Sequence, residues 1–105
     1  MTPLVRIQAG DRYEDFTDYL VCSFYPALKE FTFRVPYNKD DTRLSSLITE
    51  DGTDILVTVF EDETPTTPKL KFVGKARYFI VSNLMAGEKL GLIQDVTGLG
   101  EIELL

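Results

Sequence analysis

Residues 28–35 read LKEFTFRV, and this stretch decides the fold class because apolar and polar residues alternate along it. Phe31, Phe33 and Val35 fall on one side of an extended chain, and polar residues occupy the positions between them. Such alternation is typical of a strand with one buried face. The pattern therefore predicts a half-buried strand that stops at Pro36.

Further strands are predicted on both sides of this segment, at fairly even spacing. Residues 55–60, ILVTVF, are apolar on both faces and predict a central strand. A long strand is expected over residues 70–82, with Gly74 as a bulge or bend. The remaining predicted strands cover residues 4–8, 19–25 and 89–93.

Two short segments have helical spacing. Between Tyr13 and Leu20 the apolar residues suit one side of a helix with Asp11 as its cap, although a turn leading into a strand explains them too. We prefer a short turn or helical start before the strand at 19–25. Leu44, Leu47 and Ile48 mark a second short helix, capped by Asp40 or Asp41.

Turns are predicted where glycine, proline and small polar residues gather. Residues 61–68, which contain two prolines, predict a hairpin loop, residues 83–87 a turn, and the GLG sequence at 98–100 another turn. No βαβ rhythm is visible. We therefore expect one mainly β domain over residues 1–105, a small antiparallel β-barrel or sandwich with one or two short helices.

The composition excludes several kinds of chemistry. The 105 residues contain no histidine, so general bases, nucleophile systems and metal sites that need histidine are excluded. Cys22 is the single cysteine and is expected to be a small buried apolar residue. The formal net charge of -6 disfavours nucleic-acid and anionic membrane partners. We expect no catalysis, cofactor, metal or small-molecule substrate.

Acidic residues concentrate in two turns at opposite ends of one predicted strand, and no lysine or arginine lies between Arg43 and Lys69. The spacing fits no calcium loop, so solvated turns explain it better than a metal site. The alternative interpretation of these acidic residues is an electrostatic edge that docks a basic partner. The acidic residues are Glu50, Asp51, Asp54, Glu61, Asp62 and Glu63.

Basic residues alternate with apolar ones over 69–78, a pattern also seen in binders of single-stranded nucleic acids. One amphipathic strand explains the alternation more simply, with the basic residues facing solvent. The C-terminus is apolar at Ile102, Leu104 and Leu105. These residues either form the closing strand of the barrel or add to the sheet of a neighbouring subunit. We therefore predict an assembly interface at Glu61, Asp62, Glu63, Ile102, Leu104 and Leu105.

The order of these features resembles the small β-barrel domains of contractile-tail phage baseplates, particularly the first barrel of tail-hub proteins. The similar segments are residues 5–10 (VRIQAG), 16–20 (FTDYL), 31–35 (FTFRV), 52–59 (GTDILVTV) and 70–76 (LKFVGKA). Residues 85–105 have no counterpart, and the further domains of a hub protein are not present in these 105 residues.

The resemblance implies a free-standing structural component of a phage tail tube or baseplate, made in the host cytoplasm and located in the virion tail. Its partners would be further copies in a ring and other tail or baseplate proteins. The alternative is a small acidic protein that binds or inhibits a host protein, for instance by mimicking a nucleic-acid surface. A third hypothesis, a carboxylate-based enzyme, is supported only by the acidic turns.

Overall fold

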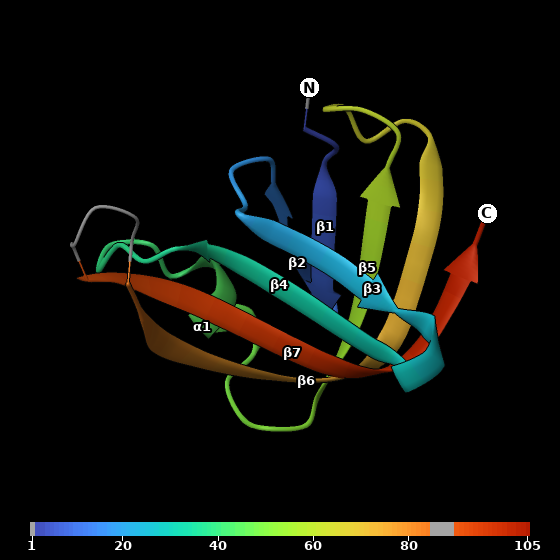
Figure 1. Ribbon diagram of the computed structural model, residues 1–105. Helices are drawn as coiled ribbons and strands as arrows, with labels where there is room; N and C mark the ends of the chain where they lie inside the picture. The colour runs from blue at the N-terminus through green and yellow to red at the C-terminus, as the bar shows by residue number, and fades with distance from the viewer. Residues whose placement is uncertain (1, 85–89) are drawn as a thin grey trace.

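The computed structural model describes residues 2–84 and 90–105 and shows a mainly β protein, as expected from the sequence (Figure 1). Seven strands and two short helical segments follow one another along the chain. They are β1 (Val5–Ala9), β2 (Arg12–Phe16), β3 (Val21–Tyr25), the 3-10 helix η1 (Pro26–Leu28), β4 (Glu30–Pro36), α1 (Arg43–Leu47), β5 (Thr53–Phe60), β6 (Pro68–Leu84) and β7 (Leu90–Leu104).

All seven strands belong to one antiparallel sheet with the order β2-β1-β5-β6-β7-β4-β3. The two end strands, β2 and β3, follow each other in the chain, but no ladder joins them in the described residues. The sheet is therefore open. Of the two predicted architectures, the sandwich describes the fold, and the closed barrel is not formed.

The sheet folds over itself because β6 and β7 are long and bend (Figure 1). Gly74 of β6 lies directly opposite Gly100 of β7, and side chains would not fit between the two backbones there. A Cβ added at Gly74 would lie 2.8 Å from the Gly100 Cα atom. Before the bend β6 pairs with β5, and beyond Gly100 β7 no longer pairs with β4. β6 and β7 form a long hairpin, and the parts of this hairpin on either side of the bend therefore belong to two different layers of the fold.

The core lies between the two layers, and the alternating segment that predicted the fold supplies its centre. Phe31, Phe33 and Val35 are completely buried, as the period of two requires. Phe31 contacts Phe72 of β6, with ring centroids 5.2 Å apart, and Phe16 meets Phe33 edge-on at 5.1 Å. β4 and β6 are separated by β7 in the sheet order, and β2 and β4 lie near its opposite ends, so these aromatic contacts hold the two layers together.

The basic alternation of β6 is that of an amphipathic strand, as preferred from the sequence. Phe72 and Ala76 are completely buried, whereas Lys75 and Arg77 are exposed. Gly74 was expected to be a bulge or a bend, and it lies at the bend without forming a bulge. The pairing register is continuous through Gly74, and the irregularity lies between Val59 and Phe60 of β5.

Other local predictions were wrong. Residues 12–16 form an edge strand, and Gly10, with a φ of 65°, occupies the hairpin turn before it. The predicted helical start and its Asp11 cap are therefore absent. The GLG sequence at 98–100 is part of β7. The predicted turn at 83–87 falls mostly outside the described residues.

The helix predicted around Leu44 and Leu47 is α1, and both side chains are buried. Its cap differs from the expected Asp40 or Asp41, because Thr42 takes the N-cap position without a side-chain hydrogen bond. The carboxylate of Asp41 instead accepts a hydrogen bond from the Arg43 backbone N–H at 3.2 Å.

Candidate interaction surface

The structure brings the two parts of the predicted assembly interface to one end of the sheet (Figure 1). The acidic residues 61–63 lie in the loop that leads into Pro68, the first residue of β6. The last residues of β7 pair with the same start of β6. Leu104 is opposite Leu70, and the Leu105 backbone N–H donates to the Lys69 carbonyl at 3.0 Å.

The acidic loop has a defined shape. The backbone N–H of Glu61 donates to the Thr67 carbonyl at 2.9 Å and closes the loop across its base. Asp62 accepts hydrogen bonds from the Thr64 backbone N–H at 2.9 Å and from its hydroxyl at 2.7 Å. The Thr64 hydroxyl, together with that N–H, lowers the pKa of Asp62. Residues 61–63 are all exposed, so their charges lie on the surface of the molecule.

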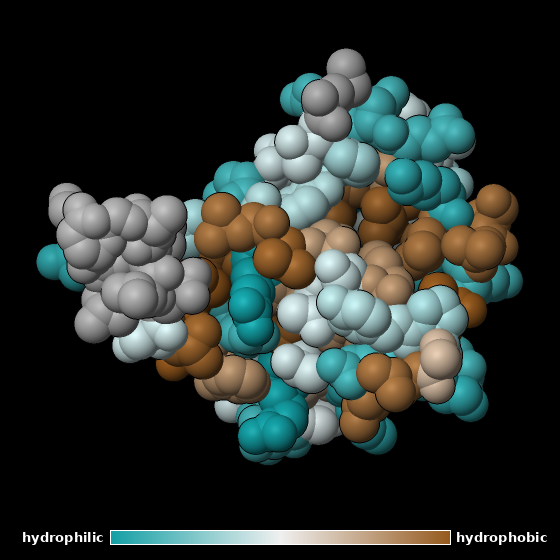
Figure 2. Space-filling view, viewed as in Figure 1, coloured by the Kyte–Doolittle hydropathy of each residue, from teal (hydrophilic) through white to brown (hydrophobic). Residues whose placement is uncertain are grey.

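The C-terminal residues pair with β6 of their own chain, but they do not close a barrel as one of the two predicted alternatives required. Ile102 lies opposite Phe72 and packs against the core. Leu104 is 79% exposed and Leu105 is 59% exposed. In Figure 2, hydrophobic side chains lie exposed at the right of the molecule, where Figure 1 places the C-terminus, and polar residues lie above them. This end of the sheet therefore combines apolar side chains with an acidic loop.

The other acidic cluster is partly neutralised by residues from β6. Lys75 Nζ lies 2.8 Å from an Asp54 carboxylate oxygen, and Arg77 Nε lies 3.5 Å from one of Asp51. Lys75 and Arg77 are far from these acidic residues in the sequence, and the pairing of β5 with β6 brings them close together. Across residues 2–84 and 90–105, no three acidic or cysteine side chains are grouped to hold a metal ion.

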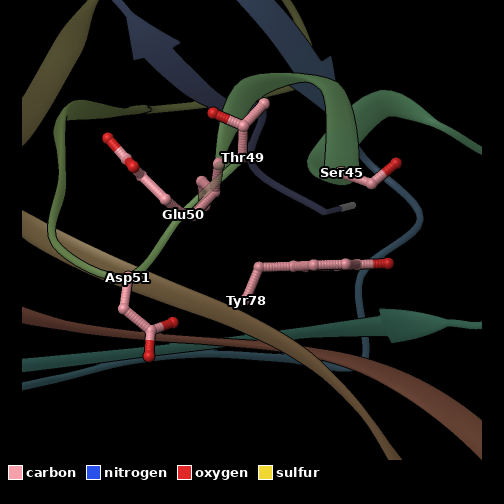
Figure 3. Close-up of a pocket in the computed structure, with 6 residues that line it drawn as sticks. Ser45, Thr49, Glu50, Asp51 and Tyr78 are labelled. Atoms are coloured by element: carbon pink, nitrogen blue, oxygen red, sulfur yellow. The ribbon is translucent and has the colours of Figure 1, made fainter.

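A hollow of about 320 Å³ lies between the end of α1 and β6 (Figure 3). It is lined by Ser45, Ile48, Thr49, Glu50, Asp51 and Tyr78. The Tyr78 hydroxyl donates to the Gln94 side-chain oxygen at 2.8 Å, and burial raises the pKa of this tyrosine. The hydroxyl is thus engaged in a structural contact.

A second hollow, of about 410 Å³, lies on the outer face of β3 and β4. Arg34 is among the residues that line it, and its Nε atom lies 3.0 Å from the buried Asp95 carboxylate. Tyr25 and Leu28 add exposed apolar surface at one side. Arg34 is one of the two charged residues that line this concave face, the other being Glu30, and it is already paired.

A buried polar network was missed by the sequence analysis. Gln94 is completely buried, and its side-chain nitrogen donates to the Pro36 carbonyl and to an Asp41 carboxylate oxygen, both at 3.1 Å. Arg43 binds Asp41 and Asp18, and its guanidinium lies 4.4 Å from the Phe16 ring centre. The network fixes the loop before α1 against the sheet, so its role is structural.

Comparison with known proteins adds no relative. No protein-family model, curated protein or solved structure matches the chain. In the part of the chain that the structure describes, no helix has the length and apolar character needed to cross a membrane.

The best-supported candidate site is the end of the sheet formed by residues 61–63 and 100–105, where exposed apolar side chains lie near the acidic loop. We call this surface the C-terminal docking end.

Proposed function

We propose that the chain is a structural assembly protein that binds its neighbours through the C-terminal docking end, as a ring-forming or adaptor component of a phage tail tube or baseplate. One observation carries the assembly role. Leu104 lies on the core-facing side of β7 opposite Leu70, yet 79% of its surface is exposed. A large apolar side chain in this position is suited to burial by a partner.

The acidic loop supports the same proposal because it lies beside this apolar surface. Exposed charges at the rim of an apolar contact guide association and select partners, while the apolar contact and main-chain pairing supply affinity. The assignment to a phage tail rests on the sequence resemblance described above. The mechanism is binding, so no covalent step is involved.

Localisation in the parent particle tests the tail assignment. Purified virions would be examined by mass spectrometry and by electron microscopy with a labelled form of this chain. We expect the chain in the tail or baseplate at a fixed ratio to other tail proteins. Its absence from purified particles would overturn the tail assignment.

The oligomeric state in solution separates the ring from the adaptor. Size-exclusion chromatography with light scattering would be run on the wild-type chain and on Leu104→Ser. A ring predicts a discrete oligomer that the Leu104 variant loses, whereas an adaptor predicts a monomer that assembles only with its partner.

The alternative, a small acidic protein that acts on a host protein, is favoured by the exposure of residues 61–63. A pull-down from host lysate distinguishes it. Capture of one host protein at low salt, lost at high salt and lost in a Glu61→Gln, Glu63→Gln variant, would favour this alternative because salt screens exposed charges.

A further inference from the structure

The last residues of β7 form an open sheet edge. The Gly100 backbone N–H donates to the Lys29 carbonyl at 2.8 Å, toward the β4 side, and the Leu105 N–H donates to Lys69 on β6 at 3.0 Å. Backbone groups alternate in direction along an antiparallel strand. Ile102 and Leu104 therefore direct their N–H and C=O groups away from β6. In the described chain no strand pairs with β7 on that side beyond Leu99.

The side chains at this edge also alternate. Ile102 and Leu104 share the core-facing side with their partners Phe72 and Leu70. Glu101 and Glu103 lie on the outer face and are exposed. A strand added to this edge would therefore place alternate residues beside the exposed Leu104 and the others beside the two carboxylates.

The pairing of β6 with this segment shows which chemistry fits. Residues 69–72 read KLKF, and Lys71 lies opposite Glu103 while Phe72 lies opposite Ile102. Glu101 also contacts Lys29, with 3.0 Å between the charged atoms. The acidic loop at residues 61–63 adds negative charge at the same end. A segment with lysine or arginine at alternate positions therefore complements this edge.

A second copy of the same edge is a poor occupant. Two-fold antiparallel pairing of Ile102 with Ile102 would place Glu101 opposite Glu103 of the other copy. Pairing of Ile102 with Leu104 would place Glu103 opposite itself. Like charges directly opposite each other destabilise a sheet. The two glutamates thus disfavour pairing between identical edges, which is a common way for natural proteins to protect an edge strand.

We propose that residues 100–104 receive, by strand addition, an extended segment of a partner protein in which apolar residues alternate with lysine or arginine. This inference rests on the assembly function proposed above and names the chemistry of the partner. Main-chain hydrogen bonds to Ile102 and Leu104 supply the pairing, the apolar residues cover Leu104, and the basic residues face Glu101 and Glu103.

The probe is a synthetic peptide of the chain's own residues 68–74, PKLKFVG, because this sequence already pairs with the same strand from the other side. The matched control is PELEFVG. Amide hydrogen exchange and fluorescence anisotropy would be measured on the full chain at low salt. We expect PKLKFVG to protect the Ile102 and Leu104 amides and to bind roughly tenfold or more tightly than the control.

Two variants localise the binding. Leu104→Pro removes a backbone N–H that points away from β6, at a side chain that is 79% exposed, so we expect peptide affinity to fall roughly tenfold while the melting temperature stays close to wild type. Glu103→Lys should reverse the preference and favour PELEFVG. Equal binding of both peptides, or protection elsewhere than Ile102 and Leu104, would overturn the proposal.

The two proposals fail separately. If PKLKFVG does not bind but the chain is found in tail particles, the partner chemistry is wrong and the tail role stands. If PKLKFVG binds as expected and the chain is absent from particles, the edge is a binding site and the tail role is wrong.

Discussion

Gly74 of β6 and Gly100 of β7 face each other at the bend that divides the sheet into two layers, and their backbones are too close to admit a Cβ atom. A Cβ at Gly100 would meet the Val73 carbonyl oxygen, and one at Gly74 would meet that of Leu99. These contacts involve backbone atoms, which cannot move aside as a flexible side chain can. The bend therefore depends on glycine at both positions.

We expect Gly100→Ala to lower the free energy of unfolding by about 1–3 kcal/mol, because the two strands must separate to admit the methyl group. Urea unfolding followed by circular dichroism measures the change. The comparison variant is Gly98→Ala, where the Cβ would meet the Phe72 ring at 3.1 Å and no backbone atom closer than 3.5 Å, so we expect a smaller loss. An equal or larger loss in the comparison variant would show that the close backbone approach at the bend is not limiting.

The sequence predicted β4 and β5 well, because burial dictates which residue types their positions accept. In β4 one face is buried, and the alternation of Phe31, Phe33 and Val35 records it directly. The edge strand β2 was mistaken for a helical start because its charged residues carry no such alternation. Its partner β1 decides its conformation, and pairing is not visible in a short polar segment.

The candidate site was predictable only in its parts. The exposed acidic loop and the apolar C-terminus are visible in the sequence, but their proximity depends on both segments meeting the start of β6. The open edge beyond Leu99 follows from where β4 begins, because Leu99 lies opposite Glu30, and this is a property of the pairing. The buried hydrogen bonds of Gln94 could not be predicted either, because its partners Pro36 and Asp41 lie far from it in the sequence.

The hydrogen bond between Tyr78 and Gln94 is expected to contribute to stability. Tyr78→Phe leaves the side-chain oxygen of the completely buried Gln94 without its 2.8 Å donor. An unsatisfied buried acceptor costs about 1–3 kcal/mol, so the free energy of unfolding should fall by that order. Tyr25→Phe, at a position that is 46% exposed, is the control. If the two variants unfold at the same urea concentration, the buried hydrogen bond is not important for stability.

Asp41 is expected to make stability depend on pH in acid. Its hydrogen bond with the Arg43 side chain lowers the pKa of Asp41 to about 2, below the unfolded value near 3.8. The folded state therefore binds this proton less readily than the unfolded state does. The stabilising contribution is complete above about pH 4 and is lost as the pH falls through about 2.

Urea unfolding of wild type and Asp41→Asn between pH 2 and pH 6 tests this expectation. The gap in stability between the two proteins should be widest near pH 6 and should narrow as the pH falls toward 2. Asp40→Asn, at the exposed neighbouring residue, controls for the change in net charge. A gap that stays constant across this range would contradict the assigned role of Asp41.

Cys22 is expected to react slowly with thiol reagents in the folded protein. It lies on β3, where it is half-buried rather than buried as expected from the sequence, and it packs against the core. This burial raises its pKa to about 12, opposed by the positive charge of Lys69. Because the thiolate is the reactive form, labelling with Ellman's reagent at pH 8 should be about a thousandfold slower than in urea-unfolded protein. Equal rates in the two states would show that β3 separates readily from β4, so that the core is accessible to solvent at this edge of the sheet.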